Sequence, residues 1–140
     1  MAVNSIMAMR RIIVNEIQAI LPDIGLTDDK FQKPNSPFEV PKGKLWIRLS
    51  TVDTSTDDQE ATGQIKTTNG IMTVDVFAPR NKGDEVAQNT AEVIRSNLSN
   101  KYYSDTLRIN QGTIQDDAEP DWYKVGVIFT YRYEGLTNGS

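Results

Sequence analysis

The sequence has 140 residues and contains neither cysteine nor histidine. Without cysteine there are no disulfide bonds, thiolate nucleophiles or thiolate zinc sites, and without histidine there is no imidazole to act as a base or a metal ligand. Most familiar enzyme mechanisms therefore lose a participant. We expect a protein that is not an enzyme and that holds no cofactor or metal.

Long apolar runs and an excess of positive charge are also missing. A membrane-spanning helix needs about 20 consecutive apolar residues, whereas the apolar pattern near the N-terminus is interrupted by Arg10 and Arg11. We expect neither a signal peptide nor a membrane span, and hence a soluble protein made in a cytoplasm without a membrane partner. The net charge is −4, which disfavours tight, sequence-independent binding of DNA.

What the sequence does contain is the pattern of one domain with two helices. The length fits a single domain, which we place at residues 1–135, with 136–140 as a flexible C-terminal tail. Apolar residues at helical spacing predict a helix that is ended by Leu21-Pro22, and a second helix that begins at Asp84 and Glu85. The residues predicted to face the core from these helices are Ile6, Met9, Ile13, Ile17, Ile20, Ala87, Ala91, Ile94 and Leu98.

Four further segments have the character of strands. Apolar and polar residues alternate in 45–52, 70–77 and 123–133, and a weaker strand is centred on Leu107 and Ile109. The acidic stretch 53–63 is expected to be a solvated loop or the tip of a long hairpin, and the acidic stretch 116–122 a second loop. This order of elements predicts an α+β fold, with a twisted, mainly antiparallel sheet of four to five strands and two helices packed on one face.

Several large or charged residues fall on the strand faces opposite the helices. If that face stays open, its aromatic residues are covered either by loops of the same chain or by another chain, because contiguous exposed aromatic area marks interaction sites. Arg80 lies in a turn beside Asp84 and is either solvated or part of an ion pair across a subunit boundary. The candidate interface residues are Trp46, Arg48, Phe77, Arg80 and Trp122.

A catalytic alternative rests on three charged residues. Asp75 lies within a predicted strand, and Asp121 and Lys124 lie near another. Metal-dependent nucleases use carboxylates to hold the metal ion and a lysine to polarise the attacking water. The spacing is generic, since a strand with a solvated face often carries such residues, so this small carboxylate nuclease is kept as the competing hypothesis.

The order of elements and several segments resemble the tail terminators of long-tailed bacteriophages. The resemblance rests on the N-terminal helix, the strand "LWIRLSTV", the acidic excursion, the block "GIMTVDVFAPRNKGDEVAQNTAEVI" and the final "PDWYKVGVIFTYRY". It covers nearly the whole chain, from about Ile6 to Tyr133. These segments are structural patterns, and none is a catalytic motif.

The resemblance implies a structural virion protein of the phage tail, assembled in the host cytoplasm. Such a protein forms a ring, usually a hexamer, that caps the tail tube, stops its polymerisation and provides the surface that joins the head. The implied partners are further copies of the chain, the tube protein and a head-completion or connector protein, while DNA passes without tight binding. Another neck or tail-completion protein is the alternative within the same virion. Acids that would line the hole of such a ring are Asp53, Asp57, Asp58 and Glu60.

Overall fold

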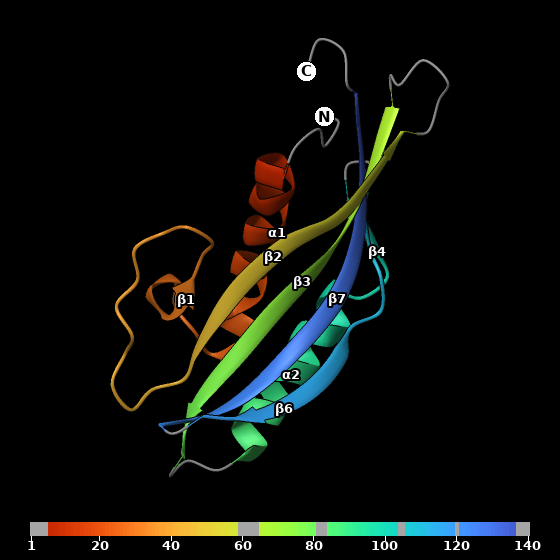
Figure 1. Ribbon diagram of the computed structural model, residues 1–140. Coiled ribbons are helices and arrows are strands. Elements are labelled where there is room, and N and C mark those ends of the chain that lie inside the picture. The colour runs from red at the N-terminus through yellow and green to blue at the C-terminus, as the bar shows by residue number, and fades with distance from the viewer. Residues whose placement is uncertain (1–5, 59–64, 81–83, 104–105, 120, 137–140) are drawn as a thin grey trace.

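A computed structural model describes residues 6–58, 65–80, 84–103, 106–119 and 121–136 of the chain (Figure 1). The first helix, α1 (Ile6–Ile20), is followed by two short 3-10 helices, η1 (Leu21–Ile24) and η2 (Asp28–Lys30). The second long helix is α2 (Asp84–Leu98). The strands are β1 (Phe31–Gln32), β2 (Trp46–Asp58), β3 (Ile65–Pro79), β4 (Lys101–Tyr103), β5 (Leu107–Ile109), β6 (Thr113–Ala118) and β7 (Trp122–Leu136).

All strands of the described residues belong to one sheet of seven strands, in the order β1-β2-β3-β7-β5-β4, with β6 paired to β7 as well. The β1–β2 pair is parallel and the others are antiparallel. The α+β class and the mainly antiparallel sheet are thus confirmed, but the expected four to five strands are too few. The sequence does not reveal β1 and β4, because strands of two and three residues are too short to show an alternating pattern.

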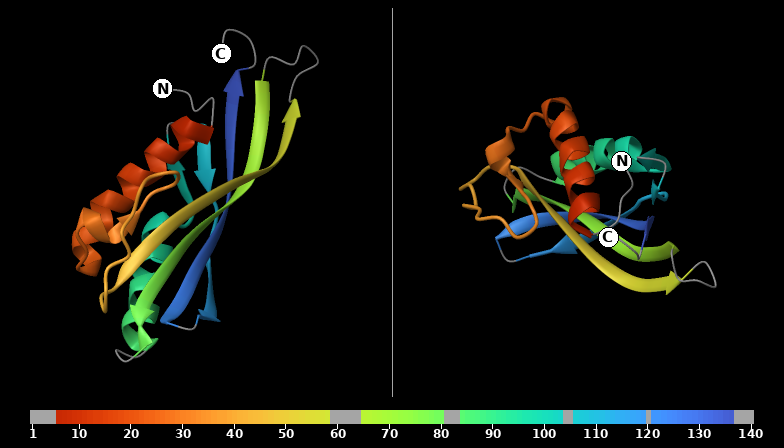
Figure 2. Two further views of the ribbon diagram at one scale, coloured as in Figure 1. Left: turned by 60° about the vertical axis from the view of Figure 1, so that its left-hand side comes forward. Right: turned by 90° about the horizontal axis from the view of Figure 1, so that it is seen from above.

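Both helices pack on the same face of the sheet, as the side and top views show (Figure 2). Pro22 follows Leu21 where α1 gives way to η1, as expected for a residue before proline. The helix residues predicted to face the core are buried, apart from Ile6, whose side chain lies outside the described part. They pack against alternate residues of the central strands, which are Ile47, Leu49, Met72, Val74, Val76, Val125, Val127, Phe129 and Tyr131.

The acidic stretch after residue 52 continues β2 into a long hairpin arm. The β2–β3 pairing reaches Asp58 and Lys66, and the arm extends beyond the helices at one end of the molecule (Figures 1 and 2). Of the two alternatives for this stretch, the long hairpin is therefore confirmed for residues 53–58. Residues 59–64, including Glu60, lie outside the described residues, as do residues 137–140 of the expected tail, whereas Leu136 still belongs to β7.

The second acidic stretch is not a loop throughout, and this part of the prediction is wrong. Residues 113–118 form β6, which pairs with β7 between Ile128 and Tyr123. The side chain of Ile114 packs against the core, and the Asp116 carboxylate accepts hydrogen bonds from Gln88 of α2 and from the Tyr123 hydroxyl. Backbone pairing with an available sheet edge outweighs the low strand propensity of aspartate.

Candidate functional site

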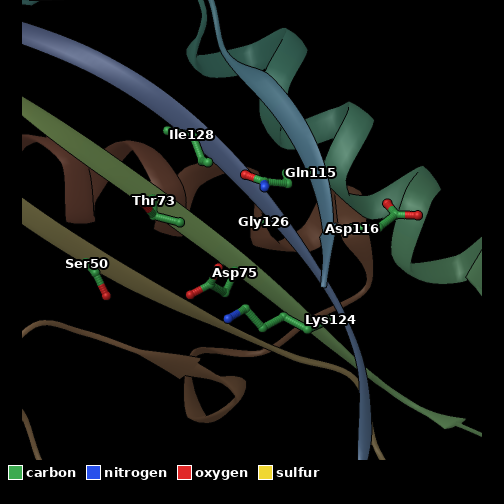
Figure 3. Close-up of a pocket in the computed structure, with 8 residues that line it drawn as sticks. All are labelled: Ser50, Thr73, Asp75, Gln115, Asp116, Lys124, Gly126 and Ile128. Carbon is green, nitrogen blue, oxygen red and sulfur yellow. The ribbon is translucent and has the colours of Figure 1, made fainter. Parts of the chain in front are cut away.

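Both helices cover one face of the sheet, and the opposite face, which we call the open face, is the candidate site (Figure 2). Cross-strand register places rows of residues side by side on this face, for example Arg48, Asp75 and Gly126 on β2, β3 and β7. A groove of about 500 Å³ lies here, and Figure 3 shows the residues that line it. They are Ser50, Thr73, Asp75, Gln115, Asp116, Lys124, Gly126 and Ile128, although the Asp116 side chain points away from the groove toward α2 (Figure 3).

Asp75, one of the residues that line this groove, forms an ion pair within the chain. The Arg48 guanidinium donates a hydrogen bond to the Asp75 carboxylate at 2.9 Å, and the Asp75 side chain is only 8% exposed. Gly126 stands next to Asp75 on the adjoining strand, where an added Cβ would lie 3.1 Å from an Asp75 carboxylate oxygen. Arg48 therefore neutralises a buried acid within its own chain, which is the ordinary requirement for burying a carboxylate.

The geometry around Asp75 does not match the catalytic alternative. Its carboxylate is paired with Arg48, whereas Asp121 is exposed at the turn before β7. Lys124 lies within 3.6 Å of the Glu119 carboxylate. Among the residues that the structure describes, no group of three or more carboxylates is placed to hold a metal ion, so the arrangement differs from the paired acids that metal-dependent cleavage uses.

The aromatic residues of this face form a cluster within the chain. The rings of Trp46 and Phe77 stack with centroids 4.0 Å apart, and Trp122 meets Trp46 edge-on at 6.0 Å. Phe38, from the segment between β1 and β2, packs on Trp46 at 5.2 Å. We define Phe38, Trp46, Phe77 and Trp122 as the aromatic cluster.

The exposure expected for Trp46 and Phe77 is wrong, because these side chains are only 4% and 2% exposed. Of the two alternatives, coverage by a segment of the same chain holds for Trp46, on which Phe38 packs. Trp122 is half-buried. Contact of these residues with another chain stays a prediction, but Trp46 and Phe77 offer little surface for it.

Arg80 is also used within the chain. Its guanidinium donates two hydrogen bonds to the Glu119 carbonyl oxygen, at 2.9 and 2.6 Å. Glu119 precedes the turn into β7, and its backbone N–H donates to the Trp122 carbonyl. Arg80 thereby ties the end of β3 to the β6–β7 turn. A subunit boundary at Arg80 stays a prediction.

Asp53, the first of the acids proposed to line a ring, lies at the base of the hairpin arm. Its carboxylate accepts hydrogen bonds from the hydroxyls of Tyr131 at 2.6 Å and Tyr133 at 2.9 Å. Arg10 of α1 donates to the neighbouring Thr51 hydroxyl at 2.6 Å. The Asp53 carboxylate thus connects β2 to β7, and this accounts for its presence without a lumen. Asp57 and Asp58 belong to β2, and their role in a lumen stays a prediction.

Tyr131 and Tyr133 should make the free energy of unfolding depend on pH in the alkaline range. Burial, reinforced by the hydrogen bond to Asp53, raises the pKa of Tyr133 from 10.0 to about 12 and also raises the pKa of Tyr131. Above pH of about 10 the unfolded chain loses tyrosine protons that the folded chain keeps, so the free energy of unfolding should fall as pH rises from about 10 to 12. Below about pH 10 both states are protonated and this contribution is fully present.

The measurement is urea unfolding at a series of pH values for the wild type and for Tyr133→Phe. The variant lacks one of the two hydroxyls that donate to Asp53, so its stability should fall less steeply above pH of about 10. Equal slopes for the two proteins would contradict the assignment of this pH dependence to Tyr133.

The structure also reveals exposed residues that the sequence did not single out. Tyr102 is 67% exposed on β4, and Arg108 of β5 lies over its ring at 5.2 Å. Val52 and Ile71 face each other on the open face and are 61% and 42% exposed. In the predicted strand centred on Leu107 and Ile109, Arg108 falls on the face opposite these two residues, but the three-residue strand β4 shows no pattern from which Tyr102 could be assigned to the open face.

Comparison with known proteins identifies the family. The sequence model of a family described as "Phage tail terminator protein" matches residues 14–127. The chain is therefore a structural protein of the bacteriophage tail. Its fold is an α+β domain whose helices pack on one face of the sheet (Figure 2). It belongs to the phage tail terminator family.

Similarity to a solved structure supports the fold alone. One solved chain superposes with a TM-score of 0.64 at 16% sequence identity, covering 86% of this chain and 92% of that one. No curated protein sequence matches significantly. None of the helices in the part of the chain that the structure describes has the length and apolar character needed to span a membrane.

Proposed function

We propose that the protein forms a ring, a hexamer in the simplest case, that caps the finished tail tube, stops further tube subunits from adding and presents the surface to which the head is joined. The observation that carries this proposal is the family match over residues 14–127. The expected partners are other copies of this chain, the tube protein and a head-completion or connector protein. DNA passes through the ring without tight binding.

The unpaired edges of the sheet support a ring. Among the described residues, β1 pairs with β2 only at Ile47 and Arg48, which leaves the outer edge of β2 unpaired from Leu49 to Asp58. On the other side, β4 and β6 each pair with a single strand. Unpaired edges are templates for association. Because the two sides of the sheet are unlike, a head-to-tail contact is favoured, and such contacts close into rings when the rotation permits.

The charge of the chain fits a ring through which DNA moves. The net charge is −4, and anionic residues around a hole would keep a polyanion from adhering to the wall. Asp57, Asp58 and Glu60 are the acids proposed for this role, because the Asp53 carboxylate is hydrogen-bonded to two tyrosines. To stop tube growth, the complex must present toward the head a surface that differs from the end of the tube. A ring of this protein presents such a surface, because its subunits differ from the tube subunits.

The test is tube assembly in the presence of the purified protein. Tube subunits polymerised alone should give long tubes of variable length, whereas added protein should give tubes with a ring at one end and no further growth from that end, as seen by electron microscopy. Heat-unfolded protein serves as the control. Tubes that bind no ring, or that keep growing past a bound ring, would contradict the capping role. A ring found between other components of the tail neck would assign the protein to a different completion step.

A further inference from the structure

The outer edge of β2 is unpaired where β1 ends. Strand β1 pairs with β2 only at Ile47 and Arg48, and the chain then turns away. Pro34 has no backbone N–H to donate to a ladder, and Asn35 adopts a left-handed conformation with φ of 55°, which a continuing strand does not use. From Leu49 to Val52, β2 therefore presents backbone groups on its outer side that no strand of the described residues pairs.

A groove runs along this edge toward α1. Its first part, of about 250 Å³, lies between Arg10 of α1, the residues after β1 and the edge of β2. Its second part, of about 220 Å³, continues between α1 and the same residues after β1, and includes Met7, which is 62% exposed. Both parts are lined by Arg10, Lys33, Pro34 and Asn35, so they form one groove, which we call the edge groove.

The edge groove is positively charged, although the chain has a net charge of −4. Its described lining residues include no acid and four basic residues, which are Arg10, Arg11, Lys33 and Arg48. Lys33 forms an ion pair with Asp28, and Arg48 forms one with Asp75. Neither of the α1 arginines forms an ion pair with a carboxylate of the described residues, and Arg11 is exposed. Two positive charges are therefore available to an acidic ligand.

Arg10 is held beside the β2 edge in a way that leaves the backbone accessible to a ligand. Its Nε donates a hydrogen bond to the Thr51 hydroxyl at 2.6 Å, which fixes the guanidinium. Its Nη2 lies 3.4 Å from the Thr51 carbonyl oxygen, which is long for a hydrogen bond. A peptide N–H can therefore replace this second contact at small cost, while the first one keeps Arg10 in place.

We propose that the edge groove binds an extended, acidic peptide segment of a partner protein, which adds a strand to β2 from Leu49 to Val52. Peptides bind exposed sheet edges in this way, because backbone hydrogen bonds give affinity and alternate side chains give specificity. Every second side chain of the added strand faces α1, where a carboxylate meets Arg10 and Arg11. The site is complete within one chain, so it does not depend on the proposed ring, and it leaves the β2 edge beyond Val52 for a ring contact.

A peptide suits the edge groove better than DNA. DNA-binding surfaces are extended and strongly basic, whereas two of the four basic residues here are neutralised within the chain. A phosphate backbone also has no N–H groups to pair with the carbonyl oxygens of a strand edge.

A second copy of the chain also matches the edge groove less well. Strand β4, at the opposite edge of the sheet, carries Lys101 and no acid. Strand β6 carries acids, but cross-strand register aligns only its first two residues, Thr113 and Ile114, with the unpaired part of β2. Asp116 lies level with Ile47, where β1 already pairs. Without a shift along the strands, the acids of a neighbouring β6 therefore miss the groove.

The test is the binding of fluorescent eight-residue peptides to the purified full chain, measured by fluorescence anisotropy. The probe alternates valine and glutamate, so that one side of the added strand is acidic, and the matched peptide alternates valine and lysine. We expect the acidic peptide to bind at least about tenfold more tightly than the basic one, with an affinity that falls as salt is added. Binding should also slow hydrogen exchange at outward-facing amides between Leu49 and Val52.

Two variants test the charges of the groove. Arg11→Glu should weaken binding of the acidic peptide by on the order of tenfold, and Arg10→Glu combined with Arg11→Glu should weaken it further. Arg132→Glu is the matched control, because its side chain is 55% exposed on β7, away from the groove, and it should leave the affinity unchanged. Circular dichroism verifies that each variant is folded, and Arg11→Glu alone decides the matter if loss of the bonds to Thr51 unfolds the double variant.

Methylation of the peptide backbone tests the added strand itself. In a paired strand, alternate residues direct their N–H groups toward the neighbouring strand and the others direct theirs away. Acidic peptides that carry N-methyl groups on one alternate set of residues should lose binding, whereas those methylated on the other set should keep it. Equal effects of the two sets would contradict strand addition.

The outcomes separate this site from the proposed function. If the acidic peptide does not bind, or binds no better than the basic one, the edge groove is not an acidic-peptide site, while tube capping stands. If a double-stranded DNA fragment binds the wild type but not the arginine variants, and the peptides do not bind, the groove is a nucleic-acid site. If the arginine variants lose ring assembly in the absence of any other protein, the occupant is a neighbouring copy. Peptide binding by a chain that forms no ring supports this inference and overturns the ring.

Discussion

Phe77→Ala should lower the free energy of unfolding by about 3–5 kcal/mol, the usual cost of deleting a buried phenylalanine ring. The Phe77 side chain is 2% exposed, one side of its ring stacks on Trp46 at 4.0 Å, and the Arg48 guanidinium lies 4.9 Å from its centroid. Removing the ring leaves a cavity beneath Trp46 and frees Arg48, whose ion pair with Asp75 then loses its support.

The measurement is urea unfolding of purified wild type and variant. Val52→Ala is the matched control, because Val52 belongs to the same sheet face but is 61% exposed, and its truncation should change stability by less than about 0.5 kcal/mol. If Phe77→Ala is as mild as Val52→Ala while ring assembly is lost, Phe77 would act at a subunit interface as the sequence suggested. A large loss of stability would place its main role in the fold of the single chain.

The elements that the sequence predicts well are those whose side chains alternate between core and solvent over many residues. Met9, Ile13 and Ile17 recur at helical spacing and define α1. The segments of β2, β3 and β7 that pack against the helices follow from the alternation of buried residues such as Ile47 and Val74 with their exposed neighbours. The buried residues recur at the period of their helix or strand, so the same pattern predicts both the type of element and the face that is buried.

The elements that the sequence misses depend on backbone pairing rather than on pattern. Strand β6 contains Asp116 and Asp117, and its place in the sheet comes from the free edge of β7 and from the bonds of Asp116 to α2 and Tyr123. The cover over Trp46 comes from Phe38, in a segment without periodicity. Alternation correctly assigned Trp46 and Phe77 to the face opposite the helices, but it carries no information on whether a distant loop returns to bury them.

In the candidate site, too, the sequence predicts which face a residue lies on but not which residues it contacts. Arg48 and Arg80 were expected to be available to partners, and each is bonded within the chain, to Asp75 and to the Glu119 carbonyl. Arg108 was not singled out, because only the three-dimensional register places it beside Arg132. The neighbours of such a charge are therefore visible only once the strand order is known, and that order brings together segments far apart in the sequence.

Gly70→Ala is expected to destabilise the protein by about 3 kcal/mol or more, at the upper end of the cost of forcing extra atoms into a packed site. A Cβ at position 70 would lie 2.2 Å from the Tyr131 ring and 2.5 Å from the Val52 carbonyl oxygen. The Tyr131 ring yields only by breaking its hydrogen bond to Asp53, and the Val52 carbonyl belongs to the backbone. The loss of unfolded-state entropy favours alanine by about 0.4–1 kcal/mol, which is too little to offset this overlap.

Gly126→Ala is the matched comparison, because it introduces the same methyl group into the neighbouring strand. Its closest neighbour would be a carboxylate oxygen of Asp75 at 3.1 Å, and the next atoms lie 3.8 Å away. A shift of a few tenths of an ångström relieves that contact, so we expect a smaller cost than at Gly70 in parallel urea unfolding. Equal costs at the two positions would show that Tyr131 and β2 yield as readily as Asp75 does. A larger cost at Gly70 would mean that the Tyr131–Asp53 contact requires glycine where the hairpin arm leaves the body of the sheet.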